Sequence, residues 1–300
     1  MFILALPWFL IALFLVEVLL VWKKKWVMVL ILAVALFLLN WWSDCFCFGH
    51  NTDFEGELKV LCLNIKGSGQ YDESKTSNIV ELIFEENPDV VFLTENFPPI
   101  RDSLLVRLQM RYPFDTRYIA HNLFLSKYPL DNQVFYENLN GGSGYVVRCS
   151  VSIGGKDVSL YGCHLSSNNY SSELDYLTPG NIDTVEEATK YLSNVKNDAH
   201  LRALEAETIN GSISEGESVI VMGDMNDICG STCLNKFKDS ALKDAWSVGG
   251  LGYGATIHHP LPYRIDHILF NDKLKLRGIK KKDTREISDH DALVAVFDLK

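Results

Sequence analysis

Several short apolar runs in this sequence end beside a side chain that can bind a proton, a metal ion or a phosphate. The runs lie at 58–63, 89–94, 158–163, 219–223, 265–270 and 293–299. The polar residues that follow or adjoin them are Asn64, Glu95, His164, Asp224, Asn226, Asp266, Asp289 and His290. Carboxylate, amide and imidazole groups of this kind suit metal-assisted hydrolysis, provided that the fold brings them together.

The spacing of two of these residues supports a shared target. Side chains two positions apart on a strand share a face, so Asp224 and Asn226 are expected to point the same way. A buried group of carboxylates repels itself and raises its own pKa values, and a divalent cation relieves that repulsion. Oxygen ligands without a Cys–His pattern favour magnesium, manganese or calcium over zinc.

Each signal is weak when it is taken alone. An Asp or Asn at the end of a strand is most often a turn residue, and a single His164 is more often a satisfied core histidine than a ligand. The joint occurrence, with each residue beside an apolar run, favours a functional site.

The runs themselves predict an α/β domain. Strand-like segments alternate with helical spacing at 77–87 and 185–209. The strands are expected at 58–64, 89–95, 145–153, 158–164, 218–224, 265–270 and 293–299. Roughly 240 residues from position 58 onward are enough to bury one core, so we expect a single domain over 58–300.

The first 42 residues have a different composition. Two apolar stretches at 1–22 and 26–42 flank Lys23, Lys24 and Lys25, and each is close to the ~20 residues that cross a bilayer. They predict a transmembrane helical hairpin with its lysine turn in the cytoplasm. The polar residues 43–57 then form a linker. The alternative is a buried hairpin of a soluble protein. Glu17 either serves a function in the membrane or simply approaches the lysines.

Charge and cysteine content narrow the choice of partners. Without residues 1–48 the net charge is −11, because that segment holds three basic and two acidic residues. A broad electrostatic clamp on nucleic acid is therefore not expected. The seven cysteines fit neither a zinc ribbon nor a disulfide scaffold. Cys229 and Cys233 could pair if the domain lies outside the cytoplasm, whereas Cys45 and Cys47 are left open between free thiols and a disulfide.

The order of the motifs resembles the endonuclease/exonuclease/phosphatase superfamily, which includes type I deoxyribonucleases and neutral sphingomyelinases. The resemblance covers roughly 58–300. The matching segments are LCLNIKG (61–67), PDVVFLTEN (88–96), LFLSKYPL (123–130), YGCHLSS (161–167), GDMND (223–227), YRIDHIL (263–269) and ISDHDAL (287–293). The segment LGYGATI (251–257) looks like membrane-anchored bacterial members with a similar hairpin. The implied fold is a four-layer α/β sandwich, with two packed mixed sheets flanked by helices.

The resemblance also implies a metal site and a substrate contact. Asn64 and Glu95 would position Mg²⁺ or Mn²⁺, with Glu95 as the principal ligand and Asp289 as support. Arg202 resembles an arginine often found after the family's HL motif, and it would either touch substrate or form a structural ion pair with a neighbouring carboxylate.

The remaining residues would carry the chemistry. Asp224 would orient or deprotonate the attacking water, and Asn226 would hydrogen-bond a phosphate oxygen. His290, held by Asp266, would act as a general acid or base or as a phosphate-binding cation. His164 would lie beside the scissile phosphate.

We therefore expect a two-pass membrane phosphoesterase, in a bacterial inner membrane, with its catalytic domain on the periplasmic or extracellular side. A phosphodiester in nucleic acid is the first choice of substrate, and a lipid head group is the alternative. The lipid bilayer is the other expected partner, and no obligate protein partner is inferred. A catalytically silent binding or scaffold domain is the second alternative. The polar segment 168–200 either helps to select substrate or is a solvated insertion.

Overall fold

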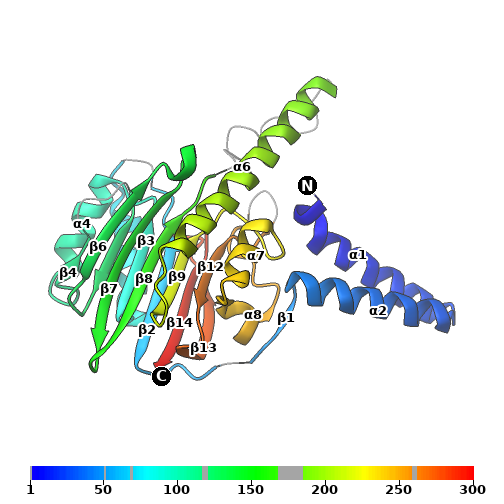
Figure 1. The fold of residues 1–300 in the computed structure, drawn as a ribbon, viewed down its shortest axis with the longest axis horizontal. Helices are drawn as coiled ribbons and strands as arrows, with labels where there is room; N and C mark the ends of the chain where they lie inside the picture. The colour runs from blue at the N-terminus through cyan, green and yellow to red at the C-terminus, as the bar shows by residue number, and fades with distance from the viewer. Residues whose placement is uncertain (1, 51, 68–69, 117–120, 168–184, 259–261) are drawn as a thin grey trace.

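The computed structural model describes all residues except 1, 51, 68–69, 117–120, 168–184 and 259–261. Of residues 2–5, 41–43 and 185–192 only the course of the backbone is described. Two six-stranded sheets dominate the structure (Figure 1). In the order of their hydrogen bonding, the first contains β10 (Lys243–Asp244), β12 (Asp266–Phe270), β9 (Ser218–Asp224), β8 (Lys156–His164), β7 (Tyr145–Ile153) and β6 (Asp131–Glu137). The second contains β13 (Leu274–Lys282), β14 (Ala292–Leu299), β2 (Leu58–Asn64), β3 (Val90–Thr94), β5 (Leu123–Ser126) and β4 (Phe114–Asp115).

Both sheets are mixed. The pairs β2–β3 and β8–β9 are parallel, and the remaining strand pairs of the two sheets are antiparallel. Parallel neighbours need a crossover, and here α3 (Glu73–Glu86) and α6 (Val185–Gly211) supply the helix in each crossover. The prediction of an α/β fold with two mixed sheets is confirmed.

Alternation along the strands separates three apolar layers. In β2, Leu58, Val60 and Cys62 pack between the two sheets, whereas Leu61 and Leu63 face α3 and α4 (Pro98–Leu108). Strand β9 repeats this pattern, with Val219 and Val221 in a cluster with α6 and α7 (Thr232–Asp239). The helices therefore cover the outer faces of the sheets, as the four-layer arrangement requires.

The two sheets approach closely at one glycine. Gly162 of β8 faces the second sheet, where an added Cβ would lie 2.2 Å from Phe92 Cε2 and 2.8 Å from Phe124 Cε2. Those aromatic rings fill the space that a side chain at 162 would occupy. Glycine is required here for close approach and not for its backbone angles.

The predicted strands are confirmed to within three residues at each end. The predicted helix at 77–87 begins earlier, at Glu73, because the Asp72 side chain accepts a hydrogen bond from Lys75 N and so caps the first turn. Strand β13, helix α4 and helix α7 were not predicted. A short ribbon pairs β1 (Cys47–Phe48) with β11 (Leu251–Gly252), and the helix α8 (Ala245–Gly249) and the 3₁₀ turn η1 (Leu139–Gly141) complete the described elements.

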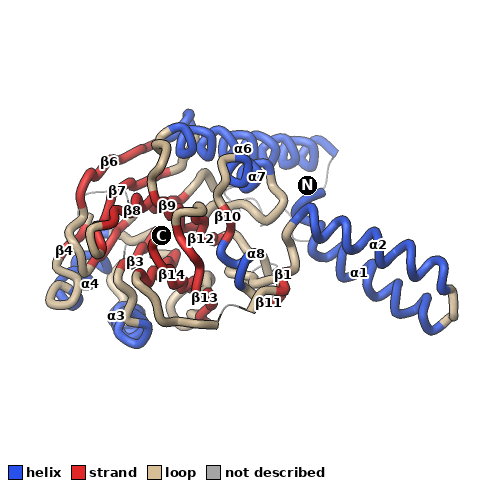
Figure 2. Tube along the Cα trace, turned by 60° about the horizontal axis from the view of Figure 1, so that its bottom comes forward, coloured by secondary structure: helices blue, strands red, loops and turns tan. Residues whose placement is uncertain are grey.

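The N-terminal segment forms two helices, α1 (Phe2–Trp22) and α2 (Trp26–Ser43), which project from the sandwich as an arm (Figures 1 and 2). Near its base, Leu6 and Leu10 pack in a cluster with Cys45 and Cys229. Within the described residues, no helix combines the length and the apolar character needed to cross a membrane. Two helices do form on either side of the lysines, but the prediction that they make a transmembrane hairpin is not supported.

The linker predicted at 43–57 is partly held against the domain. Cys47 and Phe48 pair with β11, and Thr52 forms a β-bridge with Gly278. The Arg264 guanidinium, fully buried, donates a hydrogen bond to the carbonyl oxygen of Asp44. These contacts tie the segment after α2 to the two-sheet domain.

Candidate active site

Strand register brings three of the predicted residues into one row at the edge of the sandwich. In the first sheet Asp224 of β9 lies opposite His164 of β8 on one side and opposite Asp266 of β12 on the other. Each of these positions continues the set of side chains that points between the sheets, such as Leu160, Met222 and Ile268. The apolar interior therefore gives way to a polar group where these strands end.

Asn64 joins this row to the second sheet. It continues the inward-facing series of β2, and its Nδ2 donates to Glu95 Oε1 at 2.9 Å and to Asp224 Oδ2 at 3.0 Å. Its Oδ1 accepts from Lys66 N at 2.9 Å, which fixes the orientation of the amide. Asn64 thus presents its amide nitrogen to the two carboxylates and holds them in place. The predicted role in positioning a metal would be carried out in this indirect way.

A local turn places Glu95 at the site. Glu95 follows β3 with a backbone φ of 53°, in the left-handed region that few residues with a side chain adopt. Gly67 N donates to the Glu95 carbonyl oxygen at 3.0 Å, so the loops after β2 and β3 are joined. The turn directs the Glu95 side chain toward Asn64 and His164. Glu95 Oε1 lies 3.8 Å from His164 Nε2.

His290 and Asp266 form a buried pair. His290 Nδ1 lies 2.8 Å from Asp266 Oδ2, and His290 Nε2 lies 3.9 Å from Asp224 Oδ2. Burial alone would lower the pKa of His290, but the Asp266 carboxylate raises it to about 10. Burial would also raise the pKa of Asp266, yet the facing imidazolium holds it below its usual value. The imidazole is therefore held in its charged form, with Nε2 turned toward Asp224.

Asp224 is the centre of the group. Its burial, followed by the negative charge of Asp266, raises its pKa, and its Oδ1 accepts from Asn226 N at 2.8 Å. The side chain is almost wholly inaccessible, and its Oδ2 lies 4.0 Å from His164 Nε2. A buried carboxylate with a raised pKa is a competent proton acceptor.

Two overlapping groups of side chains have ligand atoms close enough to share a cation. They are Glu95 with His164 and Asp224, and Asp224 with Asp266 and His290. The second group holds two carboxylates and one imidazole, and Glu95 adds a third carboxylate close by, so the site carries excess negative charge. Carboxylate oxygens with one imidazole suit a divalent cation of the magnesium or manganese kind. The residues present therefore fit the metal that the family resemblance implies.

The other predicted residues lie around this core. Asn226, with φ of 49°, donates from Nδ2 to the carbonyl oxygen of Leu165 at 2.9 Å. Asp289 belongs to neither metal-binding group among the described residues, and its carboxylate pairs with Lys66 Nζ at 2.5 Å. The part of segment 168–200 that covers 168–184 lies outside the described residues.

Arg202 lies apart from the site core. Its Nε donates to Asp227 Oδ2 at 3.1 Å and its Nη1 donates to the carbonyl oxygen of Ser166 at 3.1 Å, with the side chain buried. This is the ion pair that the sequence left as the alternative to a substrate contact. In this structure Arg202 holds the loop after His164.

Sequence reasoning missed three residues that shape the site. Lys66 neutralises Asp289, and Thr256 accepts hydrogen bonds through Oγ1 from Ile265 N and Asp266 N. Glu205, on α6 and fully buried, accepts from Ser166 N at 2.9 Å and so helps Arg202 to fix the loop. The only sequence signal was Glu205 three residues after Arg202 on a helix, which puts both on one face.

Comparison with known proteins agrees with this geometry. The sequence matches the endonuclease/exonuclease/phosphatase family over residues 56–290, so the chain belongs to that family. It is a hydrolase that acts on phosphoric ester bonds. Comparison with curated proteins finds no match.

Solved structures share the fold. An endonuclease/exonuclease/phosphatase from Beutenbergia cavernae is 18% identical, with a TM-score of 0.59 over 82% of this chain and 72% of that chain. A humanised D. rerio TDP2 is 14% identical, with a TM-score of 0.59 over 80% and 98%. Sphingomyelinase C from Streptomyces griseocarneus is 17% identical, with a TM-score of 0.50 over 80% and 99%. At these identities the similarity establishes the fold.

Proposed function

We propose that this protein hydrolyses phosphodiester bonds with the help of Mg²⁺ or Mn²⁺, at the site centred on Asp224. The observation that carries the proposal is the convergence of Glu95, His164, Asp224, Asp266 and His290 at one sandwich edge. These residues are separated by up to 195 positions in the chain. None of the five belongs to the apolar cluster between the sheets.

The chemistry follows from the charges in place. Glu95, Asp224 and His164 would hold the ion, which supplies Lewis-acid stabilisation of the phosphoryl oxygens. Asp224, buried at the centre of the site, would orient the attacking water beside the ion. His290, kept cationic by Asp266, binds a phosphate oxygen through Nε2 and can return a proton to the leaving group.

Two substrate classes remain, and different observations favour them. Nucleic acid is the first choice, because a metal-centred site needs few basic contacts and tolerates the net charge of −11 that residues 49–300 carry. The alternative is a phospholipid head group. It is favoured by the apolar arm and by the shared fold of the enzyme named sphingomyelinase C. The silent scaffold would need neither the excess carboxylates nor the His290–Asp266 pair.

Turnover of bis-p-nitrophenyl phosphate by the full chain tests the catalytic proposal. We expect hydrolysis with Mg²⁺ or Mn²⁺, its loss in EDTA, and its loss in Asp224→Asn and His290→Gln. Asp131→Asn is the matched control, since Asp131 is exposed at the start of β6. A folded chain that gives no metal-dependent turnover would favour the scaffold. Plasmid DNA, RNA and sphingomyelin vesicles, assayed in parallel with Asp224→Asn, then identify the substrate class.

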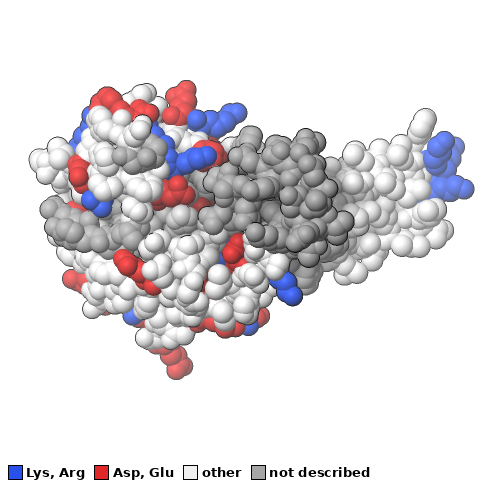
Figure 3. All heavy atoms as spheres, turned by 90° about the horizontal axis from the view of Figure 1, so that it is seen from above, with Lys and Arg blue, Asp and Glu red and all other residues white. Residues whose placement is uncertain are grey.

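We also propose that the arm holds the domain at a lipid bilayer, with the catalytic domain on the periplasmic or extracellular side. Support comes from large apolar side chains exposed along both helices, such as Phe14 at 58% and Leu30 at 66%. Lys23, Lys24 and Lys25 lie in the turn between α1 and α2. Figure 3 shows basic side chains at the far tip of the arm, whose visible surface is otherwise uncharged. The positive-inside rule would place this tip in the cytoplasm.

Membrane fractionation tests the tether. The wild-type chain should remain with membranes after a carbonate wash, and Phe14→Lys with Leu30→Lys should release it. Phe84→Lys is the matched control, since the Phe84 side chain is exposed on α3. A wild-type chain recovered in the supernatant would overturn the tether. A reporter that works only in the cytoplasm, fused after Lys300, should stay inactive, and an active reporter would reverse the orientation.

A further inference from the structure

We propose that Cys45 and Cys229 form a redox-sensitive latch, a thiol pair that closes to a disulfide and fixes the helical arm to the catalytic domain. Both residues are buried and share one apolar cluster with Leu6 and Leu10 of α1. Each thiol is the largest single influence on the pKa of the other, as expected for neighbouring side chains in one cluster. They lie 184 positions apart in the chain, one directly after α2 and the other in the loop between β9 and α7.

The pairing differs from the one that the sequence suggested. Cys233, four residues from Cys229, packs in a different cluster between α6 and the first sheet. Cys47 faces Arg264, whose Nη1 donates to its Sγ at 3.4 Å. Adjacency in sequence favoured Cys229 with Cys233, but α7 turns Cys233 into the core. All seven cysteines are free thiols in this structure.

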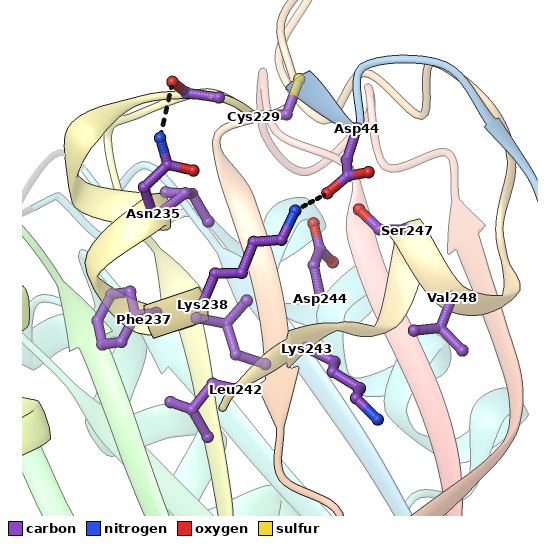
Figure 4. Close-up of a pocket in the computed structure, with 13 residues that line it drawn as sticks. Asp44, Cys229, Asn235, Phe237, Lys238, Leu242, Lys243, Asp244, Ser247 and Val248 are labelled. Carbon is purple, nitrogen blue, oxygen red and sulfur yellow. Dashed lines mark hydrogen bonds and ion pairs between the residues drawn. The ribbon is translucent and has the colours of Figure 1, made fainter. Parts of the chain in front are cut away.

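The segment that carries Cys45 is held on both sides. Arg264 Nη2 donates to the Asp44 carbonyl oxygen at 3.0 Å, and Lys238 Nζ lies 2.8 Å from Asp44 Oδ2 (Figure 4). Asn40 Oδ1 accepts from Phe46 N at 2.7 Å on the other side. Cys45 is thereby kept facing Cys229 without a covalent bond, which is the arrangement that a reversible latch needs.

The surroundings of Cys229 favour its reaction. A cavity of about 230 Å³ reaches it, lined by residues that include Asp44, Lys238 and Ser247, so a small oxidant can approach from that side (Figure 4). The neighbouring Cys45 thiol, together with the Arg264 guanidinium, outweighs burial and lowers the pKa of Cys229 below its ordinary value. A thiolate is the form that attacks a disulfide.

The oxidant is a low-molecular-weight disulfide. The Cys229 thiolate attacks one sulfur and expels the other as a thiolate, which gives a mixed disulfide on Cys229. Cys45 then loses its proton and attacks Cys229 Sγ, and the second small thiol leaves. Two protein thiols and one small disulfide thus become one protein disulfide and two small thiols.

The test is a linkage map of the full chain after treatment with oxidised glutathione. Thiols are blocked, and digested peptides are identified by mass spectrometry without reduction. We expect a peptide pair joined through Cys45 and Cys229 that dithiothreitol separates. The oxidised chain should also unfold at a temperature several degrees higher than the reduced chain. Cys47→Ser and Cys233→Ser should keep the linkage.

The variants separate the latch from chance oxidation. In Cys45→Ser the reaction should stop at the first step, leaving glutathione bound to Cys229, and Cys229→Ser should yield neither product. The urea-unfolded chain is the control that the oxidant is active. Linkage of Cys229 to Cys233 or of Cys45 to Cys47 would overturn the proposal. So would recovery of Cys45 and Cys229 as blocked thiols while the control oxidises.

Discussion

The largely buried carboxylate of Asp244, whose side chain is 12% exposed, is predicted to stabilise the fold beside the arm, and Asp244→Asn removes only its charge. Its Oδ2 lies 3.0 Å from His267 Nδ1 and 3.6 Å from the Arg264 guanidinium, and its Oδ1 caps α8 by accepting from Trp246 N. Asparagine keeps the size and the capping oxygen. Arg264, fully inaccessible, is then left without its carboxylate partner.

The unfolding free energy that Asp244→Asn removes has a constant part and a part that depends on pH. Breaking a buried ion pair from one side costs about 3–5 kcal/mol of unfolding free energy. Burial opposes the charged form of Asp244, but Arg264 and His267 outweigh it and lower its pKa from 3.8 to about 2. That difference corresponds to roughly 2.4 kcal/mol. Because the folded pKa is depressed, this contribution is complete well above pH 3.8 and is lost as pH falls toward 2.

Urea unfolding of both chains at pH 7 and pH 3 measures the two parts. We expect Asp244→Asn to be less stable by about 3–5 kcal/mol at pH 7. The difference should shrink by about 1 kcal/mol at pH 3, where Asp244 is largely protonated in the unfolded chain but still mostly ionised in the folded chain. Asp272→Asn, in an exposed pair with Lys243, should behave like wild type. A difference that is negligible at pH 7, or one that grows as pH falls, would refute this reasoning.

Three further predictions concern the active site. Glu95→Gln should raise the Mg²⁺ or Mn²⁺ concentration for half-maximal turnover by about tenfold or more. Glu215→Gln should not, since Glu215 is exposed before β9, at the opposite end of that strand from Asp224. Equal curves for Glu95→Gln and the wild type would remove Glu95 from the metal site. Asp266→Asn should lower kcat by about 10²–10⁴-fold with little change in KM. Steady-state kinetics that show a change only in KM would contradict the catalytic role of the Asp266–His290 pair. Gly144→Ala would place a Cβ 2.3 Å from Glu205 Oε1. Thermal denaturation should therefore show a loss of about 1–3 kcal/mol in unfolding free energy. An unchanged midpoint would mean that the buried Glu205 carboxylate moves freely.

The sheets and the site residues at the ends of strands could be predicted because both follow from the alternation of side chains along a strand. Leu58, Val60 and Cys62 must face the apolar interior, so Asn64 at the next position of that face lies at its edge. Asp224 follows Met222 by the same rule. Strand alternation is local, and a reader of the sequence needs no knowledge of the loops to apply it.

The remaining contacts depend on how distant segments dock. The Cys45–Cys229 pair and the Glu205–Ser166 hydrogen bond each join a helix or its end to a loop far away in sequence. No spacing rule connects such positions. Strand β13 escaped prediction for a local reason, since its register shifts between Leu276 and Gly278 and breaks the alternation.

The most direct measurement of the central claim is anomalous X-ray scattering from crystals of the full chain grown with Mn²⁺. We expect one strong anomalous peak within ligand distance of the Glu95 carboxylate, beside Asp224 and His164. This peak should be lost in crystals of Asp224→Asn. A chain that hydrolyses phosphodiesters with Mn²⁺ but binds the ion elsewhere would contradict it.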